Sequence, residues 1–221
     1  MEYRLIRSGR KTLSLCIERD GSLTVRAPLH VSESDIMRFL NGHIEWIKRH
    51  RACVLANAQE RVRPAIGGNI MFWGEAYQLD WGDQSGFDGN VIRIQRGARI
   101  LPELARLFSN EAKARLIPLA QSMARQEGVP VASVRVTGAR TRYGSCSAQN
   151  GICLSWRIVS APQPLMEAVI LHELCHVLHH NHGKKFWAEV YARMPDYKQR
   201  KRALDIWARR WFFEENEKET N

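Results

Sequence analysis

Five of the eight histidines in the chain fall within eleven residues, in the segment ILHELCHVLHHNHGKKFW that begins at Ile170. Two of them, His172 and His176, are four residues apart, so in a helix they lie one turn apart on the same face. Imidazoles at this spacing are typical ligands of a single Zn²⁺ ion. Glu173 follows the first histidine in the HExxH arrangement, which places a carboxylate near a metal-bound water. The motif therefore predicts metal-assisted hydrolysis with Glu173 as the general base.

The residues around the motif predict that it lies on a buried helix. The stretch LMEAVILHELCHVLHH, residues 165–180, is apolar nearly all round. The alternative to a metal site is a pair of hydrogen-bonded histidines inside this helix. Two histidines and a glutamate are costly to bury without a compensating ligand, and we therefore favour the metal.

A zinc site needs a third protein ligand, with the fourth position left for water. His179 and His180 continue the same predicted helix face. At about 1.5 Å rise per residue, however, His180 would lie about 12 Å along the helix axis from His172. Metal–nitrogen bonds of about 2 Å do not bridge that span, so neither residue is predicted to be a ligand.

The third ligand is therefore expected from a part of the chain that has turned back. We favour His182, because its neighbours Asn181 and Gly183 tolerate the left-handed conformation that ends a helix. Glu189 in the next predicted helix is the alternative, and it would give a site of two histidines and one glutamate.

The segments before the motif divide the chain into two predicted parts. Residues 11–30 alternate apolar and polar side chains on both sides of Asp20-Gly21, which predicts a β-hairpin. Residues 32–51 open with a capping pair and carry an apolar stripe at helical spacing. Residues 69–82 and 90–96 predict two strands around a turn-rich segment.

The second part is predicted to be mainly helical. A helix is expected from Leu101 to Gln126, with Pro118 kinking or restarting it. Two strand-like runs follow, joined at Asn150-Gly151, a strong hairpin signal. After the motif, helices are predicted over residues 184–194 and from Pro195 to about Phe213. The order of elements predicts an α+β chain, with an N-terminal β-rich lobe (1–100) and a C-terminal lobe (101–221) that carries one β-hairpin and the HExxH helix.

Several segments together resemble the YgjP-like (DUF45) metallopeptidase family, which is related to the WLM and SprT-type zinc proteases. The likeness rests on HELCHVLHHNHGKKFW, preceded by RTRYGSCSAQNGICLSWRIVSAP and followed by MPDYKQRK, and it extends to RKTLSLCIERDGSLTVRAP near the start. The resemblance implies a zincin-like, minimal gluzincin-type catalytic lobe with one Zn²⁺ per chain. It assigns the metal to His172, His176 and His182, and the general base to Glu173.

The segment TRYGSCS, upstream of the motif, is the candidate for substrate binding. In zincin-like enzymes an edge strand above the metal helix binds the substrate backbone by strand addition. Gly144 permits close backbone approach, and Arg142 and Tyr143 reach toward the site, whereas the alternative is an ordinary strand with a bulge at Gly144. Tyr197 is a candidate donor to a developing oxyanion, with packing, or a helix start capped by Asp196, as the favoured alternative.

The formal net charge of +10 favours polyanionic partners, the alternative being a basic surface without a partner. A protein or peptide is the favoured substrate. Arginines near the strand and in the last helix suit phosphate groups, so a nucleotide or phosphate-ester hydrolase, similar to a nucleoside triphosphate pyrophosphatase, is an alternative. A DNA-associated protease or nucleic-acid-binding protein is a further one.

The sequence gives no sign of a membrane protein. No apolar run reaches the length of a transmembrane helix, and residues 1–20 contain no apolar segment of the kind found in secretory signals. The five cysteines are widely spaced and form no CxxC pair, which is typical of reduced cysteines in the cytoplasm. We therefore expect a cytoplasmic protein.

Overall fold

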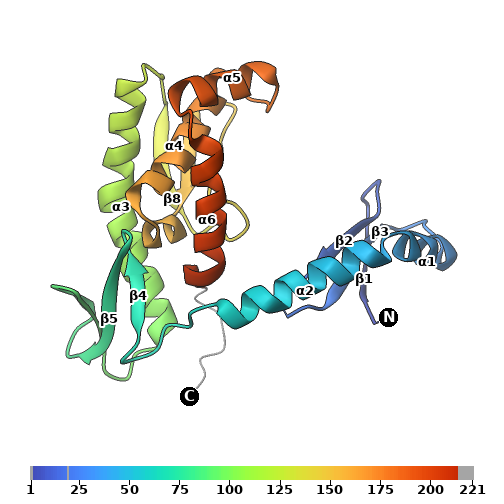
Figure 1. Ribbon diagram of the computed structural model, residues 1–221, viewed down its shortest axis with the longest axis horizontal. Coiled ribbons are helices and arrows are strands. Elements are labelled where there is room, and N and C mark those ends of the chain that lie inside the picture. Colours follow the sequence, from blue (N-terminus) through green and yellow to red (C-terminus); the bar gives the residue numbers. More distant parts are fainter. Residues whose placement is uncertain (1, 19, 214–221) are drawn as a thin grey trace. The chain divides into compact units, whose positions relative to one another are not determined.

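Two compact units make up the structure, and they divide between Arg61 and Val62. The computed structural model describes residues 2–18 and 20–213 (Figure 1). Each unit contains both strands and helices, so the predicted α+β class is confirmed. Among the described residues, no helix combines the length and apolarity needed to span a lipid bilayer.

The first unit packs a three-stranded sheet against two helices. Its elements are β1 (Arg4–Ser8), β2 (Ser14–Ile17), β3 (Leu23–Pro28), α1 (Glu33–Gly42) and α2 (Ile44–Glu60). β3 is the central strand, antiparallel to β2 and parallel to β1, which confirms the predicted hairpin. Gly21 in the turn has φ +81°, a left-handed conformation that favours glycine.

The apolar stripe predicted as one helix over residues 32–51 forms two. The backbone breaks at His43, which has φ −117° and ψ 12° and separates α1 from α2. Ile36 and Leu40 on α1 and Ile47 on α2 are buried against Val25 and the rest of the sheet. The stripe thus predicted the buried face, but not the break between the helices.

The second unit begins with a four-stranded sheet. β4 (Asn69–Phe72), β5 (Glu75–Gly82), β6 (Gly86–Asp88) and β7 (Val91–Gln95) lie in the order β4-β5-β7-β6. The prediction of two strands here was wrong, because a turn at Trp73 and Gly74, both with positive φ, divides the first run and the loop contributes β6. A side chain at Gly74 would lie 2.8 Å from the Cα of Pro162, so the turn packs closely on the segment before the motif helix.

One long helix, a second sheet, a short 3₁₀ helix and three further α-helices complete the described part of this unit. They are α3 (Ile100–Gln126), β8 (Ser133–Thr137), β9 (Gly144–Cys146), β10 (Gly151–Ser155), a 3₁₀ helix (Trp156–Ser160), α4 (Gln163–Leu178), α5 (Lys184–Arg193) and α6 (Tyr197–Trp211). α3 runs through Pro118 without a restart. The hairpin predicted at Asn150-Gly151 is confirmed; the sheet order is β8-β10-β9, so β9 is an edge strand. Figure 1 shows α4 between α3 and α6.

A single core joins the four-stranded sheet to the helix that carries the motif. Buried side chains of β4, β5, β7, α3, β10 and α4 belong to one cluster, in which the rings of Phe72 and Phe108 are 5.2 Å apart. Residues 62–100 therefore pack with the histidine-bearing part, because the sheet buries its apolar face on α3. The division into an N-terminal lobe (1–100) and a C-terminal lobe (101–221) stays a prediction.

Candidate metal centre

The HExxH motif lies on α4, and most of this helix is buried. It contacts α3, α5, α6 and the edge strand β9. Its apolar sequence allows burial on several sides at once. The buried side chains are Met166, Ala168, Val169, Ile170, Leu171, Glu173, Leu174, Cys175 and Val177.

The chain leaves α4 earlier than the sequence predicted. The helix ends at Leu178, and His179 follows in an extended conformation with φ −143° and ψ 99°. Neither Asn181 nor Gly183 has a positive φ, so the predicted left-handed end of the helix was wrong. The side chain of Asn181 instead holds the turn, since its Oδ1 accepts a hydrogen bond from the N–H of Gly183 at 3.2 Å. The chain nevertheless turns back, and it brings His182 to the motif.

Three histidines converge at one point. The Nε2 atom of His182 lies 3.1 Å from the Nε2 of His172 and 3.1 Å from the Nε2 of His176. Tetrahedral zinc with bonds of about 2.05 Å separates its ligand nitrogens by about 3.3 Å, so this donor set fits a metal ion. Glu189, the alternative ligand, is not in this group; its carboxylate accepts a hydrogen bond from Arg193 at 3.2 Å.

The second ring nitrogens of two of these histidines have partners. Nδ1 of His172 lies 2.8 Å from the hydroxyl of Tyr197, and Nδ1 of His176 lies 3.2 Å from the carbonyl oxygen of His179. A proton on Nδ1 leaves the lone pair of Nε2 for a metal, and a partner on Nδ1 fixes the ring orientation. Tyr197 is only 5% exposed and lies beside His172, at the first residue of α6.

Aromatic rings surround the three imidazoles. The ring of Phe186, which is fully buried, lies 5.0 Å from that of His172, 4.4 Å from that of His176 and 4.8 Å from that of His182. The ring of Trp187 stacks on that of His182 at 5.7 Å. Both aromatic residues come from α5, so the first turn of this helix holds the three imidazoles together.

Glu173 and Gly144 are in close contact. A Cβ atom on Gly144 would lie 2.7 Å from both Cγ and Oε1 of Glu173, a distance that real side chains do not tolerate. The pairing of β9 with β10 is regular from Gly144 to Cys146, so the alternative of a bulge at Gly144 was wrong. In the structure the close neighbour of Gly144 is the carboxyl of the motif, and the expected approach of a substrate backbone stays a prediction.

Burial controls the charge of the motif. It raises the pKa of Glu173 to about 7, and the nearby charge of Arg142 opposes this increase. Burial also lowers the pKa of His172 to about 4, with the charges of His176 and His182 adding to the effect. The pKa of His176 is lowered by burial as well. These two imidazoles are therefore neutral at pH 7, as a metal ligand must be.

The two residues before Gly144 lie in different surroundings. Arg142 is exposed, close enough to Glu173 to act on its pKa. Tyr143 contacts α6: its hydroxyl donates to Oδ1 of Asp205 at 2.9 Å, and the ammonium group of Lys201 lies 5.1 Å from its ring centre. Their predicted roles in substrate binding stay predictions.

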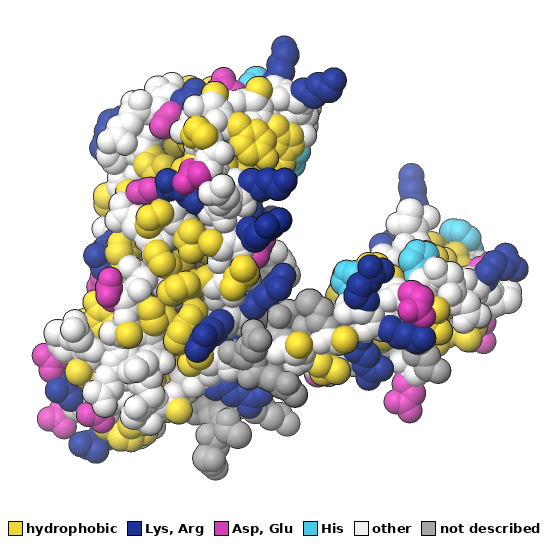
Figure 2. Space-filling model, viewed as in Figure 1, with side chains coloured by type: hydrophobic (Ala, Val, Ile, Leu, Met, Phe, Trp, Pro, Cys, Tyr) yellow, Lys and Arg dark blue, Asp and Glu magenta, His cyan; other side chains and the backbone are white. Residues whose placement is uncertain are grey.

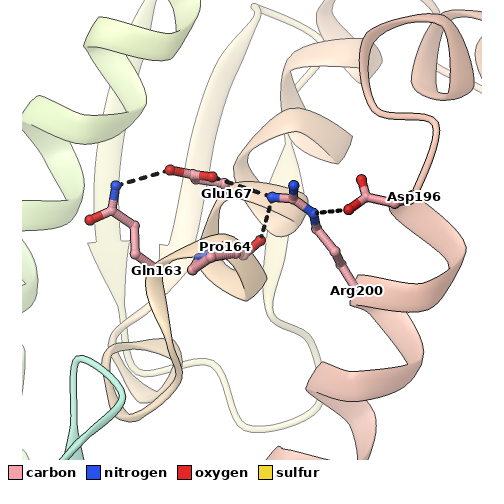
Figure 3. Close-up of polar contacts among 5 residues, drawn as sticks. All are labelled: Gln163, Pro164, Glu167, Asp196 and Arg200. Atoms are coloured by element: carbon pink, nitrogen blue, oxygen red, sulfur yellow. Dashed lines mark hydrogen bonds and ion pairs between the residues drawn. The ribbon is translucent and has the colours of Figure 1, made fainter.

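Arg200, one of the last-helix arginines considered for phosphate binding, links α4 to α6 (Figure 3). Nε of Arg200 donates to Asp196 at 2.8 Å, while its Nη1 donates to the carbonyl of Pro164 at 3.2 Å and to Glu167 at 3.4 Å. Gln163 donates to the same glutamate at 2.9 Å. Asp196 was expected to cap α6, but its side chain makes no capping hydrogen bond and binds Arg200 instead. The i, i+4 spacing of Asp196 and Arg200 was the available signal; Glu167, 33 residues away, gave none.

Comparison with known proteins gives the chain a family. The family model described as the YgjP-like metallopeptidase domain matches residues 11–206. Among solved structures, the chain is similar to the crystal structure of the metallopeptidase zymogen of Pyrococcus abyssi abylysin, with 20% identity and a TM-score of 0.39, over 43% of this chain and 97% of that one. No curated protein matches the chain. Because the family match covers the first hairpin, the three histidines and much of α6, this chain belongs to the YgjP-like metallopeptidase family.

Proposed function

We propose that the chain is a zinc-dependent metallopeptidase in which His172, His176 and His182 hold the ion and Glu173 is the general base. The observation that carries this proposal is the convergence of three imidazole nitrogens beside a buried carboxyl group. When bound, zinc supplies Lewis acidity, which acidifies water and polarises a carbonyl group.

Glu173 is suited to moving a proton in both directions. In the metal-free protein, burial raises the pKa of Glu173 to about 7, and a group with a pKa near neutral pH both accepts a proton and readily returns it. In the proposed reaction its carboxylate accepts a proton from the attacking water and gives it to the leaving amine. Contact with Gly144 limits the positions open to this carboxyl and thereby keeps it in place for both steps.

The edge strand β9 is the proposed binding site for the peptide backbone. β10 pairs with one side of β9, and no strand in the described part of the chain pairs with its other side. An extended peptide that adds to this free edge lies beside Gly144, and therefore beside Glu173. This placement supports a protein or peptide substrate, consistent with the family.

The test is a substrate panel on zinc-loaded protein, with an unfolded protein, short peptides and nucleoside triphosphates, each with and without a chelator. Wild type is expected to cleave peptides in a chelator-sensitive way. Glu173→Gln is expected to bind one zinc per chain but to lose at least about 100-fold in rate. Glu189→Gln is the matched control, and it is expected to retain both zinc and activity. A fully active Glu173→Gln protein would contradict the proposed base.

A metal-dependent nucleotide or phosphate-ester hydrolase is the second candidate. The exposed guanidinium of Arg142 near Glu173 favours it, because arginine binds phosphate oxygens well. The same panel separates the two candidates. Turnover of nucleoside triphosphates without any cleavage of peptides would replace the peptidase proposal with this one.

A further inference from the structure

The exposed face of α6 carries a row of cations. Lys198, Arg202 and Arg209 are exposed, and their spacing along the helix places them within about 40° of one another around its axis. Arg210 lies about 80° from Arg202 around the same axis and is also exposed. Figure 2 shows dark-blue side chains in succession along the α6 side of this unit. We call Lys198, Arg202, Arg209 and Arg210 the basic stripe.

Among the side chains that the structure describes, which leave out those of residues 53, 57–60 and 214–221, no acidic group forms an ion pair with the basic stripe. The acidic residue on the same face, Asp205, is bound by others: Lys201 donates to its two oxygens at 2.6 and 2.7 Å, and Tyr143 donates at 2.9 Å. Arg193 and Arg200, by contrast, both form ion pairs. The described acidic side chains therefore leave the positive charge of the stripe without an ion-pair partner.

The stripe begins at the candidate metal centre. Tyr197, whose hydroxyl lies 2.8 Å from Nδ1 of His172, immediately precedes Lys198. From Lys198 to Arg210 the helix rises by about 18 Å. A ligand held along the stripe thus has one end near the metal ligands and the other well away from them.

We propose that the basic stripe binds an acidic segment of the protein substrate and so holds a neighbouring peptide bond near the metal centre. This inference rests on the proposed function, because a peptidase selects polypeptides among polyanions. Cations four residues apart on a helix are spaced by about 6 Å along its axis. Alternate side chains of an extended peptide are spaced by about 6.7 Å, so carboxylates at every second residue match Lys198 and Arg202.

Arginine strengthens this preference, since its planar guanidinium donates two parallel hydrogen bonds to one carboxylate. Three of the four residues in the stripe are arginines. Each ion pair between a cation of the stripe and a carboxylate of the substrate would lie at the surface and contribute little alone. The selectivity therefore arises from the number and alignment of these ion pairs. The binding is expected to weaken as salt screens the charges.

The experiment compares three full-length, zinc-loaded proteins. They are the wild type, a stripe variant and a charge-matched control with four exposed cations of the same unit removed elsewhere. The stripe variant carries Lys198→Gln, Arg202→Gln, Arg209→Gln and Arg210→Gln; the control carries Arg96→Gln, Lys113→Gln, Arg125→Gln and Arg135→Gln. Labelled peptides that end in a run of glutamates or a run of glutamines are titrated by fluorescence anisotropy, at low salt and at about 0.15 M. Cleavage of the same peptides is then followed.

Wild type and control are expected to bind the glutamate peptide at least about tenfold more tightly than the glutamine peptide at low salt. When cleavage by these two proteins is measured, the glutamate peptide should have a lower KM than the glutamine peptide and the same kcat. The stripe variant should show neither difference, while it still cleaves the glutamine peptide like the wild type. Equal losses in stripe variant and control would overturn the proposal, because net charge alone would then explain the binding.

Two other results are informative. If single-stranded DNA of matched charge binds the stripe more tightly than the glutamate peptide and displaces it, the surface is a nucleic-acid site and the proposal is wrong. If the glutamate peptide binds through the stripe but no peptide is cleaved, the peptidase proposal fails while the preference of the stripe for acidic polypeptide is supported. The binding measurement thus separates the two proposals.

Discussion

At the scale of single residues, the candidate site depends on very close packing. A Cβ atom at position 144 would lie 2.7 Å from Oε1 of Glu173, so any other residue type there requires the carboxyl to shift. The sequence predicted that Gly144 allows close approach of a substrate backbone; its contact with Glu173 was not predicted, because the two residues meet only through the packing of β9 on α4. Periodicity placed His172 and His176 one turn apart; the contact of Tyr197 with His172 joins residues 25 apart and depends on tertiary structure.

Gly144→Ala is expected to displace the carboxyl of Glu173, since the new Cβ would overlap it. We expect kcat to fall at least about tenfold with KM little changed, because a shift of about 1 Å at a reacting group is costly. Zinc content should stay at one per chain. Gly86→Ala is the control, as nothing lies within 4 Å of a Cβ at that position. An active Gly144→Ala enzyme would refute this role of the contact.

Tyr197→Phe removes only the hydroxyl that contacts Nδ1 of His172. We expect zinc affinity to fall by about 10- to 100-fold, because the partner of a metal-binding histidine fixes its orientation. Competition with a chromophoric chelator measures this change. Tyr191→Phe is the matched control, since that tyrosine is 41% exposed and its ring lies 6.3 Å from that of Tyr197. Equal zinc affinity in Tyr197→Phe and wild type would rule the role out.

The raised pKa of Glu173 predicts a pH-dependent stability of the metal-free protein. The folded state binds the proton of the Glu173 carboxyl more tightly than the unfolded state does, because the pKa of Glu173 in the unfolded state is near 4.5. The resulting stabilisation is fully present below pH 4.5 and is lost as the pH rises through about 7. The unfolding free energy of Glu173→Gln minus that of wild type should therefore increase by about 3 kcal/mol when the pH is raised from about 4.5 to about 8.

Urea unfolding of both metal-free proteins across this pH range measures the difference. The histidines are common to the two proteins, so their titration cancels in the comparison. A difference in unfolding free energy that stays constant with pH would show that the carboxyl has an ordinary pKa.

At the scale of elements, the local sequence pattern predicted two hairpins and two of the helices, but it missed one turn and one helix break. The two hairpins at Asp20-Gly21 and Asn150-Gly151 and the helices α3 and α4 follow from turn residues and apolar periodicity. The turn at Trp73 and Gly74 was missed because a non-glycine residue has positive φ there and because its packing partner, Pro162, is distant in sequence. The helix break at His43 was missed because the apolar stripe continues across it.

Arg200 is expected to stabilise the docking of α6 on α4. Arg200→Gln removes the contacts with Asp196, Glu167 and the carbonyl of Pro164, and the unfolding free energy should fall by about 1–2 kcal/mol. The side chain of Arg200 is 27% exposed, so solvent keeps this value modest. Arg202→Gln serves as the control, because Arg202 is exposed and should change stability little. Equal stability of the two variants would be evidence against this role.

At the scale of the whole molecule, the two compact units divide at residue 61, whereas sequence patterning placed a boundary at residue 100. The pattern showed where strands give way to helices, but it contained no information on which core the strands join. That information lies in contacts such as Phe72 with Phe108, between β4 and α3.

Limited proteolysis tests which boundary governs folding. Because residues 62–100 share a core with α3 and α4, we expect a protected fragment that retains residues 62–213. Mass spectrometry of the fragments identifies its ends. A stable fragment that begins near residue 100 would instead support the predicted domains.

The position of Tyr197 has a thermodynamic consequence for the end of the chain. Tyr197 is the first residue of α6 and is also the partner of His172, a proposed metal ligand. Metal binding and the docking of α6 are therefore thermodynamically coupled. A ligand that binds only the folded state adds about 2.7 kcal/mol of stability at 100 times its Kd. Part of that free energy would oppose local unfolding of α6, so higher occupancy of the proposed metal site would make detachment of this helix rarer.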